Sequence, residues 1–281
     1  MAEILYGKPV ADALAADLLQ RAEALSAAGK KPTLAIVRVG ENGDDIRYES
    51  SIEKRCSLCG ITVIKKIMPR NCLQIDLERV IRQVNGDDSI HGCLLLRPLP
   101  KSMDERYVCN LLDPRKDVDS ITDSSLVMLF TGSGYGFAPC TAQAVIEILD
   151  YYGYNIAGSD AAVIGRSLVI GKPVSMMLQS RNATVTMCHR KTADPAEKCR
   201  RADILIAAAG MPHVITAEYT NPDQIIIDVG INVGADGSVT GDADFETLRD
   251  KVRAISPVPG GVGSVTSAVL CKHVIEAAET A

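Results

Sequence analysis

The chain has 281 residues, of which 47% are hydrophobic and 23% are charged, and its formal net charge is −5. This ordinary globular composition excludes disordered and fibrous classes, and the lack of a basic face argues against a nucleic-acid partner. No stretch approaches eighteen apolar residues and no secretory signal opens the chain, so we expect no membrane partner and a cytoplasmic location. The length predicts two domains with a cleft between them.

The first half of the chain alternates helical and strand patterns. Apolar residues at helical spacing follow Gly7, and the run Thr33–Val39 is β-branched and apolar, which is typical of a buried strand. The pattern then predicts a helix over 45–58, a strand over 62–68, a helix over 75–84 and a strand over 93–96. Strands that alternate with helices indicate a parallel sheet covered on both faces.

The second half repeats this alternation after two stretches rich in Gly, Pro, Ser and Asp, Asp113–Ser120 and Thr131–Pro139. We expect the chain to cross between domains in this region, with Thr141 capping a helix over 142–151. Later patterns predict strands over 161–164, 184–188, 204–207 and 224–229 and helices over 171–179 and 266–279. The predicted fold class is therefore α/β in two domains.

The nine cysteines are scattered through apolar runs, which is typical of reduced, buried thiols. Cys56 and Cys59 form a single CxxC without a second pair or nearby histidines. That pattern is a weak metal signal, so we expect two helix thiols and no metal site.

A glycine-containing turn joins a predicted strand to a predicted helix between Gly165 and Pro173. Gly165 can adopt angles closed to other residues, Gly171 allows a phosphate to approach, and Pro173 suits the first turn of a helix whose free N–H groups attract anions. The spacing departs from G-x-G-x-x-G, so a plain strand-to-helix connection is the alternative.

Cations near this turn bear on the choice of cofactor. The next strand ends in His189-Arg190-Lys191, and Arg166 lies in the turn itself. An acidic residue at this place binds a ribose hydroxyl of NAD, whereas cations favour the extra phosphate of NADP. The pattern indicates NADP, with NAD as the alternative if these residues are only solvated loop charges.

Ordered blocks along nearly the whole chain resemble the methylenetetrahydrofolate dehydrogenase/cyclohydrolase family. They are Val39-Gly40 before a helix that carries Tyr48, Pro98-Leu-Pro100, Lys116-Asp-Val-Asp119, Pro139-Cys-Thr141, Gly165-Arg-Ser167, the strand from Thr184 to His189, Asp228-Val-Gly-Ile-Asn232, and Pro257-Val-Pro-Gly-Gly-Val-Gly263.

The resemblance implies a catalytic, folate-binding domain from residues 1–141 plus about 266–281, and a Rossmann-like NAD(P)-binding domain from 142–265. It implies a homodimer that oxidises 5,10-methylenetetrahydrofolate to the methenyl form in one-carbon metabolism, which serves purine biosynthesis. Tyr48 would stack on the folate and Asp119 would bind the pterin, the two catalytic positions. The other implied contacts are Pro259, Gly260 and Gly261 with the ligands and Ser167 and Ile231 with the cofactor.

The chain departs from the family at two positions that matter for chemistry. Members with both activities carry a lysine four residues after the tyrosine, where this chain has Ile52, and a glutamine where it has Leu96. Hydride transfer depends mainly on positioning, whereas cyclohydrolysis needs general acid–base help. We therefore expect a dehydrogenase whose cyclohydrolase activity is weak or absent.

Three alternatives remain at this point. A shifted or irregular helix, suggested by Asp44-Asp45 in place of a small pair, would let Lys54 restore a bifunctional enzyme. The chain could instead bind folate or nucleotide without catalysis, or oxidise an unrelated substrate. His273, which stands where the family has an asparagine, is expected to be a partly exposed helix residue.

Overall fold

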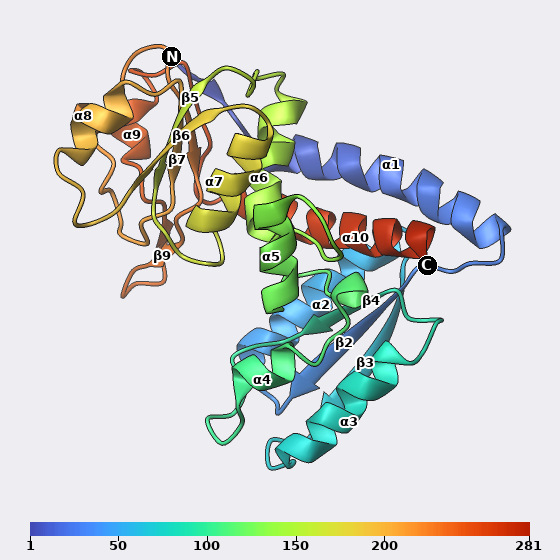
Figure 1. Ribbon diagram of the computed structural model, residues 1–281. Helices are drawn as coiled ribbons and strands as arrows, with labels where there is room; N and C mark the ends of the chain where they lie inside the picture. The colour runs from blue at the N-terminus through green and yellow to red at the C-terminus, as the bar shows by residue number, and fades with distance from the viewer. The chain divides into compact units, whose positions relative to one another are not determined.

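The computed structural model describes residues 1–281 and divides the chain into two compact units (Figure 1). Unit 1 consists of Met1–Asp12 and Thr141–Thr266, and unit 2 consists of Ala13–Cys140 and Ser267–Ala281. The expected boundaries differ from this division mainly in the first twelve residues. These join unit 1 because strand β1 (Glu3–Ile4) pairs in parallel with β11 (Ala254–Ile255).

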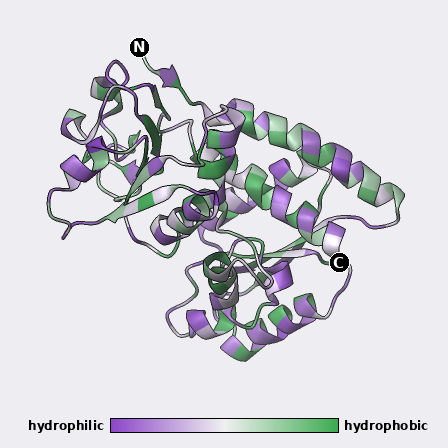
Figure 2. Ribbon diagram, turned by 45° about the horizontal axis from the view of Figure 1, so that its top comes forward, coloured by the Kyte–Doolittle hydropathy of each residue, from purple (hydrophilic) through white to green (hydrophobic).

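A six-stranded parallel sheet forms the centre of unit 1, in the order β1-β11-β8-β7-β5-β6. The remaining strands are β5 (Asp160–Ile164), β6 (Thr184–Cys188), β7 (Ile204–Ala207) and β8 (Ile225–Asp228). Figure 2 shows the hydrophobic residues concentrated in strands of this sheet. All of β7 and β8 is buried, as their continuous apolar runs predict for strands covered on both faces.

Short helices and a hairpin complete unit 1. They are α7 (Gly171–Ser180), α8 (Pro195–Arg200), η2 (Ala217–Tyr219), α9 (Phe245–Leu248) and the antiparallel pair β9 (Asn232–Val233) and β10 (Val239–Thr240). Helix α6 (Cys140–Tyr151) begins earlier than expected. Thr141 is therefore its second residue and not its N-terminal cap, which corrects the sequence-based prediction.

A three-stranded parallel sheet, in the order β3-β2-β4, forms the centre of unit 2. Its strands are β2 (Thr33–Val39), β3 (Thr62–Met68) and β4 (Gly92–Leu95), and the helices of the unit are α2 (Gly43–Leu58), α3 (Gln74–Asn85), α4 (Glu105–Cys109), η1 (Pro114–Lys116) and α5 (Asp123–Thr131). Two longer helices, α1 (Gly7–Ala27) and α10 (Gly263–Thr280), contain residues of both units.

Helix α5 lies between the two stretches of loop-like composition, 113–120 and 131–139, where the sequence analysis predicts no element. Its N-terminus is capped by the Thr122 hydroxyl, which accepts a hydrogen bond of 3.1 Å from the Ser125 N–H. Gly132, with φ of 68°, ends the helix in the left-handed region. None of the helices combines the length and apolar character that crossing a bilayer requires.

Candidate active site

The sheet of unit 1 has a topological switch point at β5. The chain runs from β5 to β6 on one side and then crosses to β7 on the other side of β5. In open α/β sheets, ligands bind at such a point, beyond the carboxyl ends of the strands. The turn after β5 and the loop after β7 are therefore the first candidates for a ligand site.

Close backbone packing explains both glycines of the turn after β5. Gly165 has φ of 131°, and a Cβ added there would lie 2.0 Å from the carbonyl oxygen of Ala208. A Cβ on Gly171 would lie 2.3 Å from the carbonyl oxygen of Gly165. The turn is closed by Ser167, whose Oγ accepts a hydrogen bond of 3.1 Å from the Ile170 N–H. Pro173 is buried in the first turn of α7, so the N-terminus of that helix opens onto the turn.

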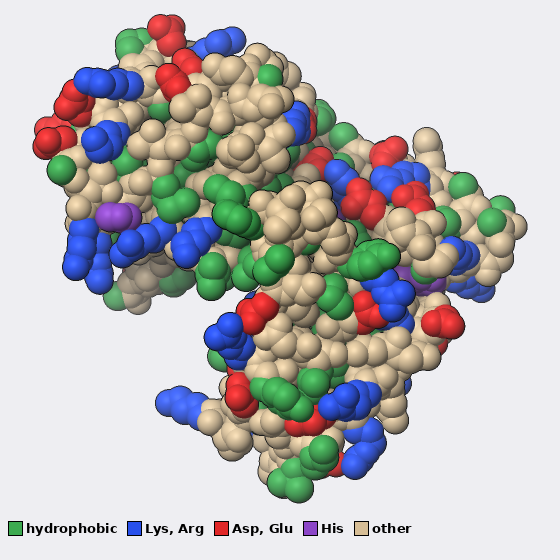
Figure 3. Space-filling model, viewed as in Figure 1, with side chains coloured by type: hydrophobic (Ala, Val, Ile, Leu, Met, Phe, Trp, Pro, Cys, Tyr) green, Lys and Arg blue, Asp and Glu red, His purple; other side chains and the backbone are tan.

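Unpaired cations surround this turn. Arg166, Arg190 and Lys191 are exposed, and no carboxylate pairs with them. They follow β5 and β6, whose last residues pair side by side, so their loops meet at one edge of the sheet. Figure 3 shows Lys and Arg side chains gathered beside a histidine on this face of unit 1. Such a group of free cations suits an anion with several negative charges, such as a phosphate monoester.

His189 shapes the cationic loop. Its Nδ1 accepts a hydrogen bond of 3.2 Å from the Lys191 N–H, and its backbone N–H donates to the Thr192 hydroxyl at 2.9 Å. An Nδ1 that accepts must be unprotonated, so the ring proton of the neutral imidazole is on Nε2.

A cavity of about 210 Å³ in unit 1 brings together four more of the predicted residues: Ile231, Pro259, Gly260 and Gly261. Gly260 has φ of 104°, and a Cβ on Gly261 would lie 2.5 Å from the carbonyl oxygen of Pro257. Both glycines are therefore required by the path of the backbone. Ile231 is 65% exposed, so its side chain is accessible to a molecule bound in this cavity.

In unit 2, the fold brings Tyr48 and Asp119 into one electrostatic neighbourhood. Tyr48 lies on α2 and is 41% exposed as a whole residue, and burial of its phenol group beside Asp119 and two cysteines raises its pKa. Burial also raises the pKa of Asp119 to about 6, although a hydrogen bond from Cys140 and the charge of Arg97 oppose the shift. Asp119 can therefore change its charge in the physiological pH range.

Cys140 and His273 stand beside Asp119, and the sequence analysis singled out neither as a site residue. His273 is only 3% exposed, which contradicts the expectation of a partly exposed side chain. Its Nδ1 lies 2.8 Å from the carbonyl oxygen of Val118 and 3.7 Å from the sulfur of Cys140. The imidazole also stacks on Phe137 at a centroid distance of 4.9 Å. These contacts fix the backbone next to Asp119.

Helix α2 is continuous from Gly43 to Leu58, so its register follows from ordinary helical spacing. Ile52 lies one turn after Tyr48 and is fully buried, and Leu96 is 6% exposed. Lys54 lies about 200° around the helix from Ile52 and is exposed without a polar partner. A local irregularity that would bring Lys54 next to Tyr48 is absent.

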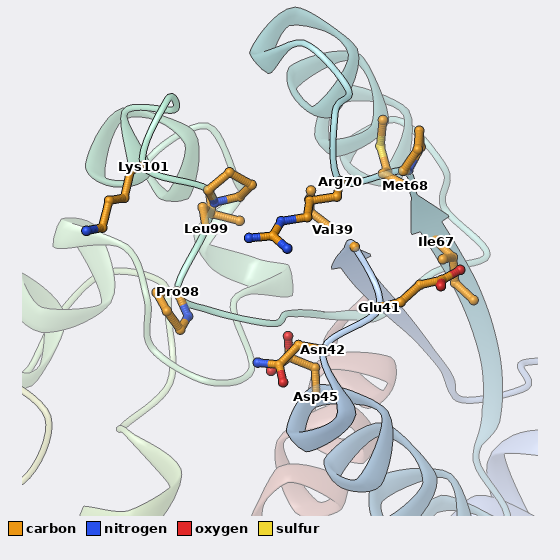
Figure 4. A pocket seen from close by; sticks show the side chains of 13 residues that line it. Val39, Glu41, Asn42, Asp45, Ile67, Met68, Arg70, Pro98, Leu99 and Lys101 are labelled. Atoms are coloured by element: carbon orange, nitrogen blue, oxygen red, sulfur yellow. The ribbon is translucent and has the colours of Figure 1, made fainter.

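The largest cavity described in the molecule, about 1100 Å³, lies at the carboxyl ends of the unit 2 strands (Figure 4). In Figure 4 the Arg70 guanidinium points into the open space, while Asn42 and Asp45 lie across from it and Lys101 points away. Asp45 precedes Tyr48 by one helical turn, so the cavity adjoins the face of α2 that carries the tyrosine.

All nine cysteines are free thiols, and no group of three metal-binding side chains has the geometry to hold an ion. Cys56 and Cys59 are both buried, at the end of α2, and the sulfur of Cys56 lies 3.9 Å from that of Cys271.

Comparisons with known proteins identify two matching family models. Residues 5–119 match the catalytic domain of tetrahydrofolate dehydrogenase/cyclohydrolase, and residues 139–281 match its NAD(P)-binding domain. The chain is 44% identical over 280 residues to "Bifunctional protein FolD 1" of Desulfitobacterium hafniense, with 100% of both chains covered.

Solved structures agree with this result. The FolD enzyme of Campylobacter jejuni superimposes with a TM-score of 0.95 at 34% identity, covering 100% of this chain and 99% of that chain. The FolD of Trypanosoma brucei, complexed with NADP cofactor and an inhibitor, gives a TM-score of 0.89 at 30% identity, with 99% and 98% coverage.

Proposed function

Because the chain belongs to the tetrahydrofolate dehydrogenase/cyclohydrolase family, we propose that it is an NADP-dependent 5,10-methylenetetrahydrofolate dehydrogenase with weak or absent cyclohydrolase activity. The dehydrogenase half follows from family membership. One observation carries the loss of the second activity: α2 is regular and directs the buried Ile52, not a lysine, to the face that carries Tyr48.

In the dehydrogenase reaction, unit 1 would bind the cofactor and unit 2 would bind the folate. The turn from Gly165 to Pro173 would accept the cofactor's phosphates, and Arg166, Arg190 and Lys191 would bind the additional phosphate of NADP. Ile231 would contact the dinucleotide, and Pro259, Gly260 and Gly261 would bring backbone close to both the folate and the dinucleotide. The cofactor supplies the hydride acceptor, so the protein contributes binding and orientation.

Tyr48 and Asp119 would orient the folate without moving a proton. The Tyr48 ring offers a flat apolar surface for stacking, and the Asp119 carboxylate accepts hydrogen bonds from N–H groups at a pterin edge. When the hydride leaves the methylene carbon, the lone pairs of the two neighbouring folate nitrogens stabilise the cation that develops. No side chain has to act as a base in this step.

Cyclohydrolysis makes a different demand. Water adds to the methenyl carbon and loses a proton, and the carbon–nitrogen bond breaks as the leaving nitrogen gains one. Ile52 and Leu96 have no group that exchanges protons, and Lys54 is exposed on another side of α2. Several relatives carry the name bifunctional FolD, which implies both activities, whereas we propose only the dehydrogenase activity for this chain.

The test is a side-by-side measurement of both activities on the purified protein. We expect reduction of NADP with methylenetetrahydrofolate, slower reduction of NAD, and hydrolysis of methenyltetrahydrofolate close to the buffer rate. The Lys54→Ala variant should match Lys251→Ala, an exposed control in unit 1, in both assays. Fast hydrolysis that Lys54→Ala abolishes would show a bifunctional enzyme, and no reduction of either cofactor would indicate a binding protein.

We further propose that the enzyme acts in the cytosol as a homodimer. Membership of the tetrahydrofolate dehydrogenase/cyclohydrolase family is the observation that supports this proposal. Light scattering on the purified protein should give twice the 30.0 kDa mass of one chain, and a monomer mass at micromolar concentration would contradict the dimer.

A further inference from the structure

Asp242 is a buried carboxylate at the ligand-binding edge of the unit 1 sheet, and neither the sequence motifs nor the reaction accounts for it. Its exposed fraction is 0%, and no cation pairs with it. It follows β10, at the base of the hairpin that begins with Asn232. Burying an unpaired carboxylate is costly, so its hydrogen-bond partners must stabilise it.

Four N–H groups from two different loops bind this carboxylate. Its Oδ2 accepts hydrogen bonds from the N–H groups of Ala209 at 2.5 Å and Gly210 at 2.9 Å. Its Oδ1 accepts from the Met211 N–H at 3.0 Å and from the Asn232 side-chain amide at 2.9 Å. Three consecutive backbone donors of the loop after β7 are thus joined through one side chain to the segment after β8.

Glycines allow the backbone to pack closely against the carboxylates of Asp242 and Asp228. A Cβ on Gly230 would lie 2.2 Å from Oδ1 of Asp242. The backbone of Asp242 is itself held by a second buried acid, because its N–H donates to Oδ1 of Asp228 at 3.0 Å. A Cβ on Gly241 would lie 2.0 Å from Oδ2 of Asp228. Two glycines and two acids therefore form one packed arrangement.

Both connected loops belong to the candidate cofactor site. The N–H of Ala208 donates to the carbonyl oxygen of Ile164 at 2.8 Å, so the loop after β7 packs directly on the turn that starts at Gly165. Asn232 directly follows Ile231, which lines the 210 Å³ cavity with Pro259–Gly261. Asp242 thus connects the loop that packs on the Gly165 turn to the segment that lines the 210 Å³ cavity.

We propose that Asp242 is a positioning residue for the dinucleotide, holding the loop 208–211 and the segment around Ile231 in the arrangement that binds it. This inference rests on the proposed function. Because the amides of Ala209, Gly210 and Met211 are used by Asp242, the loop has carbonyl oxygens but none of these donors to offer a ligand. It therefore suits hydrogen-bond donors of a nucleoside, such as hydroxyl and amide groups, and not a phosphate.

The test compares Asp242→Asn with Asp250→Asn, a matched control at an exposed aspartate of the same unit. In the Asp242→Asn variant, the new side-chain amide would bring an NH₂ group against backbone N–H donors and displace the loop. We expect the Kd and KM for NADP to rise at least tenfold, with kcat at saturating NADP within about threefold of the wild type and an unchanged KM for the folate. A purely structural defect would instead lower the active fraction, and so kcat, at an unchanged KM for NADP.

A second variant keeps the proposal testable if Asp242→Asn does not fold. Gly230→Ala leaves the charge in place and pushes the carboxylate away from Met211 and Asn232, so it should also raise the KM for NADP. Gly237→Ala is the control: at the hairpin tip, with φ of 80° and no atom near the added Cβ, it strains the backbone without touching Asp242 and should leave the KM for NADP unchanged. Wild-type values in both Asp242→Asn and Gly230→Ala would overturn the role of Asp242. A wild-type protein that fails to reduce NADP would overturn the proposed function instead.

Discussion

Two buried carboxylates, one in each unit, have different kinds of partner. In unit 2, Glu49 on α2 pairs with Arg38 on β2 at 2.8 Å and with Lys65 on β3 at 3.2 Å. In unit 1, Asp242 binds only N–H groups of two loops. The first arrangement fastens a helix to a sheet, and the second shapes a surface that a ligand can occupy. The side of α2 that bears Tyr48 is left with the apolar Ile52 and no proton donor at that position.

The largest effect is expected from breaking the ion pair in unit 2. Glu49→Gln leaves the Arg38 guanidinium buried without its carboxylate, which should cost about 3–5 kcal/mol of unfolding free energy. Glu53→Gln is the control, since Glu53 pairs with the same Lys65 at the surface and should contribute only about 0–1 kcal/mol. Urea denaturation of the three proteins measures the difference, and equal losses would show that burial of the pair is unimportant.

The same comparison has a pH dependence. Burial opposes ionisation of Glu49, but hydrogen bonds from Arg38 and Lys65 hold its pKa below the ordinary 4.5. A lowered pKa means that the stabilisation is complete above pH 4.5 and is lost as the pH falls through the folded-state pKa. The stability difference between wild type and Glu49→Gln should therefore shrink in acid. A difference that grows on acidification would contradict this sign.

Restoring a proton donor to unit 2 is the next largest change. The double substitution Ile52→Lys and Leu96→Gln should raise hydrolysis of methenyltetrahydrofolate by about 10²-fold, the lower range for a positioned acid–base group. Ser51→Lys is the control, because it places a lysine at the adjacent, exposed position of α2. Loss of methenyltetrahydrofolate absorbance without nucleotide measures the rate. If the double variant stays at the buffer rate, other residues limit this activity.

Removing one cationic side chain from unit 1 should weaken the binding of NADP and not that of NAD. Arg190→Ala should raise the KM for NADP roughly tenfold or more, the value of one charge-assisted hydrogen bond to a phosphate, and leave the KM for NAD nearly unchanged. Initial rates with each cofactor decide this, with Lys251→Ala as the control for a lost surface charge. Equal increases for NADP and NAD would place Arg190 at a phosphate that both cofactors share.

The smallest effect concerns Asp119 and is confined to mildly acidic pH. Burial raises its pKa to about 6, so the carboxylate that would accept hydrogen bonds from the pterin is neutralised below that pH. The kcat/KM for the folate should fall up to tenfold per pH unit below about 6, and Asp119→Asn should be low and flat there. For stability the sign is opposite to that of Glu49: ionisation of Asp119 lowers stability as the pH rises from 3.8 towards 6.

The sequence predicts the long, regular parts of this fold well. Four strands, including Thr33–Val39 and Thr184–Cys188, have the predicted bounds because they are rich in β-branched and apolar residues. Strands β1 and β11 have two residues each, too few for a periodic pattern, and form only because each finds a neighbour far along the chain. Helix α5 was not predicted either, because its nine residues form a short pattern between two stretches of loop-like composition.

The residues of the candidate site also fall into two groups, those that the sequence predicts and those that it does not. Gly165, Gly171 and the free cations around them are visible in the sequence because a strand, a glycine turn and a helix follow one another directly. The role of Asp242 is not visible in the sequence, because three of its partners are backbone N–H groups, which every residue except proline carries. His273 was expected to be exposed because one helical position cannot show that Val118, Phe137 and Cys140 enclose it.

The pairing of β1 with β11 also has a consequence for the order in which the chain folds. Residues 3–4 and their sheet neighbours, residues 254–255, lie far apart in the sequence, so the edge of the unit 1 sheet forms only when both segments are present. Unit 2 likewise combines Ala13–Cys140 with Ser267–Ala281. Neither unit consists of one continuous segment that could fold before the rest of the chain. We therefore expect the two units to complete their folding at nearly the same time.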